Sequence, residues 1–406
     1  MAARIVGLVV ALSLCACGSE SDASGSGGAS GSGGAAGASG SGGACVPSTP
    51  TPPAEASGCD GAGRFEVPVD ESARGPWPVG ARLATIAGLP AEVWYPAQLG
   101  SEQCQPKLGY DIREQLPDSE AQKIPDADAP LQECDCYRDL PLDEAHGPYP
   151  IVVMVHGTAS FRTLSLSLQT HWASRGFVVV AADHPGIRLK HLLSLLIGQP
   201  TGETADQVGD VSKMLPEITA ASGDLAFLSG HLDTARIGLA GHSAGGGAIS
   251  GFGDSAQVLI SMSSGGTKPG AALASSLLVS GMADGIVKFA DTVVPAYDGS
   301  PTKKRLVGVT GAGHSLPTDL CTLGADKGGI LQIAVDHGVD VPATIVKLAQ
   351  DGCAAENLAP EDGLAIVRGV TTAALEETLS CSAGATTALS GTQSTYPEVG
   401  DFREAL

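Results

Sequence analysis

The sequence predicts an α/β fold with one mainly parallel sheet, and two observations lead to this prediction. Short apolar runs of strand length recur along the chain and alternate with stretches that suit helices, as in a parallel sheet covered by helices. A glycine-flanked serine stands directly after one of these runs, where a strand would turn sharply into a helix. The apolar runs comprise residues 149–155, 236–240, 256–264, 276–281 and 305–310.

The predicted domain spans residues 59–406 and carries two insertions. This length suits a single α/β domain with additional segments between its strands. The first insertion covers about 99–145, and the second covers about 187–227, before the strand that precedes the serine. Within the second, residues 189–197 are apolar enough to wall a pocket or form a lid, and a packed core helix is the alternative.

The pattern G-x-S-x-G occurs at residues 241–245, which read Gly-His-Ser-Ala-Gly. The apolar run before it predicts a strand, and the small residues after it predict the start of a helix. In this setting the two glycines allow the strained turn that exposes a serine hydroxyl above the edge of a sheet. Ser243 is therefore the candidate nucleophile, and the alternative is an ordinary helix N-cap serine.

A serine nucleophile needs a base, and the base needs a carboxylate that orients it. Asp284 follows one predicted strand, and His314 follows the next one within Gly-Ala-Gly-His. Because the carboxyl ends of parallel strands meet at one edge of a sheet, we predict a catalytic triad of Ser243, Asp284 and His314. The alternatives are that Asp284 only forms a turn, with Asp291 or Asp254 as the acid, and that His314 is a solvated loop residue.

Acyl transfer also needs two backbone N–H groups that bind the developing oxyanion. One donor is expected from Ala244, the residue after the serine, and the other from the loop after an earlier strand. We place the second donor at Thr158, with Ala159 as the next candidate. Two further histidines, His156 and His242, are interpreted as structural residues of the loop and the turn.

Several stretches of the chain resemble platelet-activating-factor acetylhydrolases, a group that includes bacterial proteins described as predicted dienelactone hydrolases. The resemblance implies an eight-stranded α/β-hydrolase fold, a triad of Ser243, Asp284 and His314, and hydrolysis of carboxylic esters. Dienelactone hydrolases proper use a cysteine nucleophile, whereas this turn carries serine. The similar stretches are residues 89–96, which read L-P-A-E-V-W-Y-P, 156–163, 173–186, 241–246, 311–314 and 371–375, and the resemblance as a whole extends over most of residues 80–380.

The sequence accordingly predicts a serine esterase that cleaves short-chain acyl or acetyl esters. Bacterial cutinases and polyester hydrolases have a similar G-H-S-x-G-G-G turn, so cutinase-like hydrolysis of polyesters or lipids is an alternative. Those enzymes carry a tryptophan shortly after the next strand, whereas Trp77, Trp94 and Trp172 all lie elsewhere in this chain. A second alternative is a hydrolase-fold surface protein that binds a partner without turnover.

The N-terminus is interpreted as a lipoprotein signal peptide at residues 1–16. Arg4 precedes an apolar stretch, 5–14, that is too short to span a membrane. Cys17 follows Leu-Cys-Ala and is the predicted lipidation site, and residues 17–58 are a predicted flexible tether rich in Gly, Ser and Ala. We therefore expect an exported, membrane-anchored protein, in the outer membrane or at the cell surface rather than in the inner membrane.

Cysteine usage fits this location. The chain has ten cysteines, and removal of Cys15 with the signal and lipidation of Cys17 leave eight. An even number of cysteines in an exported chain predicts disulfides. Cys321 is expected to pair with Cys353 or Cys381, which would fix the loop after the catalytic histidine.

Composition narrows the range of partners. The net charge is −21 and there is no basic run, which argues against nucleic acid. The C-x-C pair at 134–136 is too closely spaced for a zinc site, and we predict no cofactor and no metal. The predicted partners are a small-molecule or polymeric ester substrate and the membrane that holds the lipid anchor, and a monomer is favoured.

Overall fold

The computed structural model describes residue 45 and residues 47–406. The predicted signal peptide at 1–16 and the predicted lipidation site Cys17 lie outside these residues. The chain divides into two units, Met1–Cys45 and Val46–Leu406, and all helices and strands of the described residues belong to the second. In the described part of the chain, no helix is long and apolar enough to cross a membrane.

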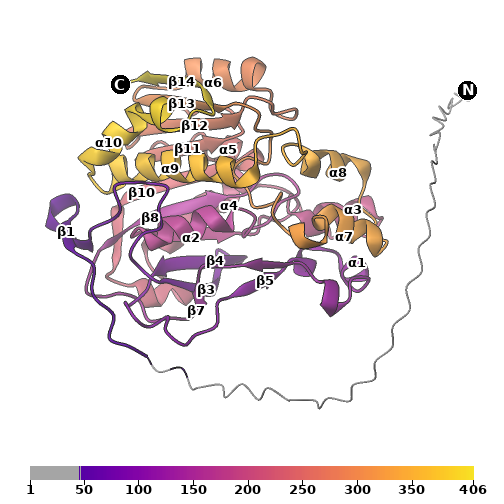
Figure 1. The fold of residues 1–406 in the computed structure, drawn as a ribbon, viewed down its shortest axis with the longest axis horizontal. Helices are drawn as coiled ribbons and strands as arrows, with labels where there is room; N and C mark the ends of the chain where they lie inside the picture. The colour runs from indigo at the N-terminus through magenta and orange to yellow at the C-terminus, as the bar shows by residue number, and fades with distance from the viewer. Residues whose placement is uncertain (1–44, 46) are drawn as a thin grey trace, which may run out of the picture. The chain divides into compact units, whose positions relative to one another are not determined.

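A ten-stranded sheet forms the centre of the second unit (Figure 1). The strands from β9 through β8, β10, β11 and β12 to β13 pair in parallel, which confirms the predicted parallel core. The sheet pairs antiparallel where β4 meets β3 and β9, and where β14 meets β13. In spatial order the strands are β14 (Val399–Ala405), β13 (Lys304–Val309), β12 (Ser275–Gly281), β11 (Val258–Met262), β10 (Leu232–His242), β8 (Tyr149–Val155), β9 (Val178–Ala182), β4 (Leu89–Pro96), β3 (Val79–Ile86) and β7 (Tyr137–Arg138).

The predicted count of eight strands was too low, because one additional strand lies at each edge of the sheet. β7 comes from the first insertion and adds a short parallel pair to β3. β14 is the C-terminal strand, and it pairs along the whole of β13. Both additions cover edges that would otherwise expose unpaired backbone groups.

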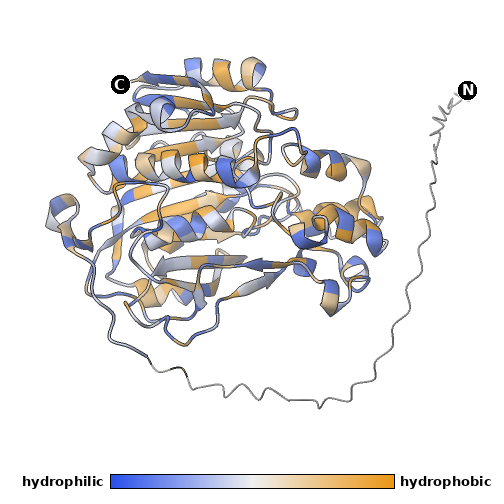
Figure 2. Ribbon diagram, viewed as in Figure 1, coloured by the Kyte–Doolittle hydropathy of each residue, from blue (hydrophilic) through white to orange (hydrophobic). Residues whose placement is uncertain are grey.

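The central strands are buried on both faces, as expected for parallel strands covered by helices. In β8, Val152 and Met154 contribute to one hydrophobic core, while Ile151 and Val153 contribute to the other. This alternation follows from the two-residue repeat of a strand. Figure 2 shows that the central strands are hydrophobic along most of their length.

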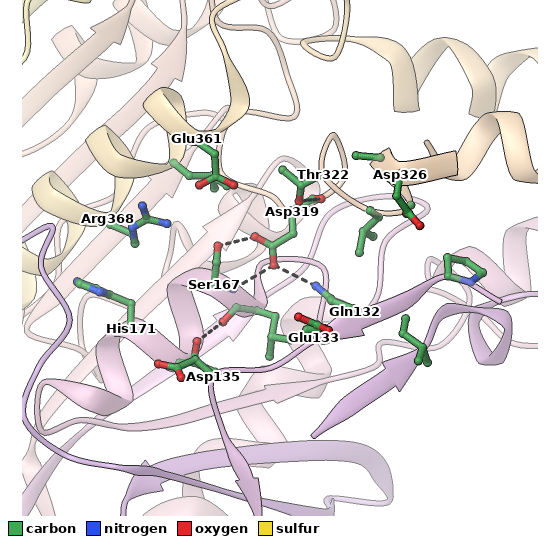
Figure 3. A pocket seen from close by; sticks show the side chains of 18 of the residues that line it. Gln132, Glu133, Asp135, Ser167, His171, Asp319, Thr322, Asp326, Glu361 and Arg368 are labelled. Carbon is green, nitrogen blue, oxygen red and sulfur yellow. Dashed lines mark hydrogen bonds between the residues drawn. The ribbon is translucent and has the colours of Figure 1, made fainter. Parts of the chain in front are cut away.

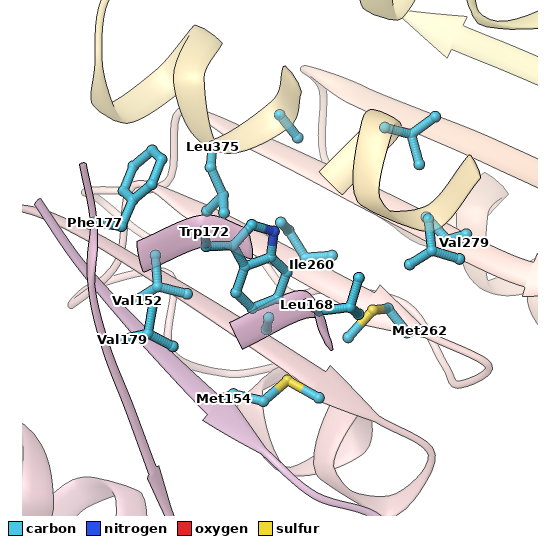
Figure 4. Close-up of a cluster of buried hydrophobic side chains, with 14 of the residues drawn as sticks. Val152, Met154, Leu168, Trp172, Phe177, Val179, Ile260, Met262, Val279 and Leu375 are labelled. Atoms are coloured by element: carbon cyan, nitrogen blue, oxygen red, sulfur yellow. The ribbon is translucent and has the colours of Figure 1, made fainter. Parts of the chain in front are cut away.

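Helices cover both faces of the sheet and complete the two cores. On one face, α2 (Leu166–Ser174) and α9 (Pro360–Leu379) enclose the fully buried Trp172, whose indole N–H donates to Thr371 Oγ1 at 3.3 Å. Figure 4 shows Trp172 among side chains from the sheet and from α9. On the other face, α4 (Gln207–Thr219) and α5 (Ala244–Ile249) contribute to the second core.

The two predicted insertions differ in how they relate to the sheet. The second contains α3 (Leu189–Leu196), α4 and η4 (Gly223–Leu228), but α4 buries Met214 and Ile218 in the core of the sheet. This part is therefore the helical crossover between β9 and β10, because parallel strands need a connection that returns over the sheet. The first insertion forms β5 (Gly109–Asp111), η2 (Ile112–Gln115), α1 (Asp118–Ala121), η3 (Asp126–Asp128), β6 (Leu131–Glu133) and β7.

The remaining elements flank the sheet and the segment after His314. They are β1 (Glu55–Ser57), η1 (Cys59–Gly61), β2 (Gly63–Phe65), η5 (Phe289–Val293), α6 (Val294–Gly299), η6 (Ala325–Lys327), α7 (Ile330–Asp336), α8 (Ala343–Gln350), α10 (Ala383–Ser390) and α11 (Thr392–Thr395).

Disulfide bonds join both distant and neighbouring positions of the domain. Cys321 pairs with Cys353, one of its two predicted partners, and Cys381 pairs instead with Cys59. A further disulfide joins Cys134 and Cys136. Regular structure also begins before residue 59, because β1 lies within the predicted tether and pairs with β2.

Candidate active site

The sharp turn between β10 and α5 holds Ser243 in a strained conformation. Its φ of 53° and ψ of −119° are far from the values that a non-glycine residue prefers. Glycines make this turn possible, since a Cβ atom at Gly245 would lie 2.1 Å from the carbonyl oxygen of Val155, and one at Gly241 would lie 2.5 Å from the Gly245 carbonyl carbon. The amide of Ser243 donates to the Met262 carbonyl at 2.9 Å, which anchors the turn to β11.

The structure brings the three predicted side chains of the triad into one hydrogen-bonded chain. His314 Nε2 lies 3.0 Å from Ser243 Oγ, and His314 Nδ1 lies 2.8 Å from Asp284 Oδ2. Asp284 follows β12 and His314 follows β13, at the carboxyl ends of adjacent parallel strands. Both side chains are buried. An imidazole in this position can accept the serine proton while a carboxylate holds its other nitrogen.

Asp284 has one oxygen for the histidine and one for its own loop. Its Oδ1 accepts hydrogen bonds from the backbone amides of Ile286 at 2.8 Å and Val287 at 2.7 Å. Asp284 therefore both stabilises its own turn, as the alternative interpretation expected, and contacts His314. Of the alternative acids, Asp254 accepts a bond from Ala271 N, and Asp291 is exposed on the π-helical turn η5.

The loop after β8 lies against the candidate nucleophile. A Cβ atom at Gly157 would lie 3.0 Å from Ser243 Cβ. Of the two candidate donors in this loop, Ala159 already donates its amide to the Ile187 carbonyl at 2.9 Å. Thr158 and Ala159 both line the same cavity as His314, but no hydrogen bond within the described residues engages the Thr158 amide, and Ala244 is the first residue of α5. These contacts favour Thr158 over Ala159 as the partner of Ala244.

Two buried neutral histidines fix the backbone around the site. His242 Nε2 donates to the carbonyl oxygen of His314 at 3.0 Å, and burial lowers the pKa of His242 to about 3. His156 Nδ1 donates to the Gly157 carbonyl at 2.8 Å, its Nε2 accepts the His184 amide at 3.0 Å, and burial lowers its pKa to about 4. Neither ring contacts the hydroxyl of Ser243, in line with the structural roles predicted for them.

These buried histidines predict a loss of stability in mild acid. Burial also lowers the pKa of His171 to about 3, so three histidines, with His156 and His242, resist protonation in the folded state. Their pKa in the unfolded chain is about 6.5, so below that pH only the unfolded chain binds these protons, and stability falls from there towards pH 4. At about 1.4 kcal/mol per pH unit and per histidine, these three groups together should lower the free energy of unfolding by about 6 kcal/mol between pH 8 and pH 5, and the raised pKa of the buried carboxyls Glu92 and Asp319 offsets part of this loss.

Urea denaturation at both pH values, followed by circular dichroism, measures this difference. His171→Gln removes one of the three groups and should reduce the difference by about 2 kcal/mol. The same difference between the two pH values in His171→Gln as in the wild-type protein would contradict the prediction.

An apolar cavity of about 90 Å³ opens beside His314. The first insertion, the loop after β8, α3, the segment directly after His314, α7 and α8 all contribute to its wall. Leu189 and Leu193 of α3 line it, which assigns that helix a wall role, while Leu195 and Leu196 are exposed. Further apolar residues in the lining are Ile112, Leu116, Ile124, Phe161, Leu164, Leu320, Ile330, Leu331, Ile333, Val341, Ile345 and Leu348.

A larger, polar cavity of about 880 Å³ lies apart from the triad (Figure 3). Among its described lining residues are both acidic and basic side chains, and none of the triad residues. At its base, Asp319 accepts hydrogen bonds from Ser167 and from Gln132 Nε2, and burial raises the pKa of this carboxyl. Asp319 thus fastens the segment after His314 to α2 and to the first insertion.

Asp351 is a residue of the site that the sequence did not indicate. Its carboxylate accepts hydrogen bonds from the backbone amides of His314 and Gly285. Nothing in the sequence around Asp351 distinguishes it from an ordinary aspartate after a helix. In the described residues, no group of His, Cys, Asp or Glu is placed to hold a metal ion.

Parallel strands, a strained serine turn and a Ser–Asp–His order along the chain are the arrangement typical of hydrolases of the α/β class. Residues 129–186 match the family platelet-activating factor acetylhydrolase, isoform II. This stretch includes β8, the loop with Thr158, α2 and β9. The match and the fold together support the α/β-hydrolase superfamily, and over this stretch the chain is similar to the platelet-activating factor acetylhydrolases. No curated protein matches the chain.

Proposed function

We propose that this protein is a serine esterase that acts on carboxylic esters with short acyl groups. The observation that carries the proposal is the continuous chain of hydrogen bonds from Ser243 Oγ through His314 to Asp284. The family match supports hydrolysis of esters in general, and the elbow geometry supports a serine nucleophile.

In the proposed reaction Ser243 Oγ attacks the ester carbonyl carbon and transfers its proton to His314 Nε2. The amides of Ala244 and Thr158 stabilise the negative oxygen of the tetrahedral intermediate. His314 then gives its proton to the departing alcohol, which leaves an acyl group on the serine. A water molecule, deprotonated by His314, releases the carboxylic acid and restores the serine hydroxyl. Asp284 keeps the imidazole in the required tautomer throughout.

The apolar cavity supports short acyl groups. An apolar cavity of about 150 Å³ can hold benzene, which corresponds to about 25 Å³ per carbon atom. On that scale the cavity of about 90 Å³ beside His314 accommodates about three or four carbons. Most of its wall is apolar, and Arg113, which also lines it, is already paired with Asp111 and Asp126, so a charged acyl group would be buried at a cost.

Location at a membrane is part of the same proposal. The apolar stretch before Cys17 and the Gly/Ser/Ala-rich segment after it support export and lipid anchoring. The disulfides of the domain are compatible with an oxidising compartment outside the cytoplasm.

A series of p-nitrophenyl esters from acetate to decanoate tests the substrate class. The value of kcat/KM should be highest for acetate to butyrate and should fall by at least about tenfold at octanoate, since about 1.4 kcal/mol of lost binding has that effect. A maximum at decanoate would contradict the short-chain assignment. Release of soluble product from an insoluble polyester, with weak activity on short esters, would favour the cutinase-like alternative instead.

A further inference from the structure

The chain leaves the active site after His314 and returns to it at Asp351. Between these two residues it forms η6, α7 and α8. The disulfide between Cys321 and Cys353 joins the start of this excursion to its end. Asp351 directly follows α8, the helix from which Ile345 and Leu348 line the apolar cavity. The returning segment therefore links the cavity wall to the backbone of the site.

The carboxylate of Asp351 bridges the loops that carry the acid and the base. Its Oδ1 accepts the backbone N–H of His314 at 2.7 Å, and its Oδ2 accepts the backbone N–H of Gly285 at 3.0 Å. Gly285 is the neighbour of Asp284. In addition, the Asp351 carbonyl oxygen accepts the amide of Ser315 at 3.0 Å. One residue thus contacts the backbone on both sides of the Asp284–His314 pair.

Two glycines make room for this carboxylate. A Cβ atom at Gly285 would lie 2.6 Å from Asp351 Oδ2, and one at Gly313 would lie 2.6 Å from Asp351 Oδ1. The same atom at Gly313 would lie 2.5 Å from the backbone of Gly352. Side chains at the positions next to the acid and the base would therefore displace the bridge.

We propose that Asp351 is a positioning residue for catalysis, which sets the relative placement of the Asp284 and His314 loops. The inference rests on the proposed esterase function. The two amides meet different oxygens of the Asp351 side chain, so this geometry needs an acceptor at both positions, and a carboxylate supplies one at each. Asparagine supplies only one, and alanine supplies none. The loops are also joined by a backbone bond from Ala283 N to Ala312 O at 2.9 Å, so loss of the carboxylate should loosen the site without unfolding it.

Asp351→Ala and Asp351→Asn in the full chain test the inference with p-nitrophenyl butyrate. A small misplacement of catalytic groups lowers the rate by up to about 100-fold, so kcat should fall by about that factor for alanine and by about tenfold for asparagine. KM should stay within about twofold of the wild-type value, because Asp351 is not among the residues that line the cavity beside His314. The matched control is Asp336→Ala, which removes another carboxylate of the excursion that bonds only to Gln332 in the described structure.

Proton NMR supplies a readout that a purely structural role would not change. The proton between His314 Nδ1 and Asp284 should give a downfield resonance in the wild-type protein, and this resonance should broaden or shift in Asp351→Ala while the melting temperature stays near that of Asp336→Ala. Unchanged kcat and an unchanged resonance in both Asp351 variants would overturn the inference. If both Asp351 variants lost thermal stability in proportion to their loss of kcat, the inference would also be overturned, because Asp351 would then act only by stabilising the fold. If the wild-type protein itself hydrolyses no ester, the esterase proposal fails, and the resonance alone then decides the role of Asp351.

Discussion

Replacing Ser243 with alanine should lower kcat for p-nitrophenyl butyrate by about a million-fold, the loss that removal of a serine nucleophile causes in a triad hydrolase. The hydroxyl is the only group of the chain that lies at hydrogen-bond distance from His314 Nε2 among the contacts of the described residues. Without it no acyl-enzyme forms, and only the oxyanion donors and the bound geometry still accelerate attack by water. Initial rates at saturating ester, followed by p-nitrophenolate absorbance, measure the change.

A fluorophosphonate probe separates loss of the nucleophile from loss of the fold. The wild-type protein should react covalently at Ser243, and Ser243→Ala should stay unlabelled. Ser212→Ala on α4 is the matched control, because its hydroxyl only donates to the Val208 carbonyl and should be dispensable. A folded wild-type protein that neither reacts with the probe nor hydrolyses esters would favour the non-catalytic binding alternative.

The triad could be predicted from the sequence because each of its members is tied to a local pattern. Gly241 is required by a close contact with Gly245 inside the turn, although Gly245 is required by the Val155 carbonyl of β8, which is distant in the sequence. Asp284 and His314 each follow a buried apolar strand, and parallel strands bring such positions to one edge of the sheet. The same reasoning placed the loop with Thr158 beside the nucleophile, since that loop also follows a parallel strand.

Other features depend on contacts between segments that no local pattern connects. Asp351 meets His314 across 37 residues, and its importance comes from two backbone amides that face it. Cys59 and Cys381 pair across 322 residues, so spacing alone could not assign Cys381. β14 became part of the sheet only through its tertiary pairing with β13. The crossover helix α4 was grouped with an insertion because its apolar face becomes evident only against the sheet.

Replacing Asp284 with asparagine should lower kcat by about ten thousand-fold while the fold is preserved. The asparagine oxygen can still accept the amides of Ile286 and Val287, which hold the loop in the present structure. Its NH₂ group then faces His314 Nδ1, and that nitrogen must become an acceptor. The proton of the neutral imidazole moves to Nε2, where it prevents the ring from accepting the proton of Ser243.

Asp291→Asn is the matched control for this variant, because Asp291 follows the same strand but is exposed on η5. It should leave kcat within about twofold of the wild-type value, as for a surface substitution that touches no catalytic group. Parallel measurement of kcat and of urea denaturation for both variants decides between the two carboxylates. A large loss of kcat in Asp291→Asn together with normal turnover in Asp284→Asn would show that Asp291 is the catalytic acid. The hydrogen bond between Asp284 and His314 would then be only structural.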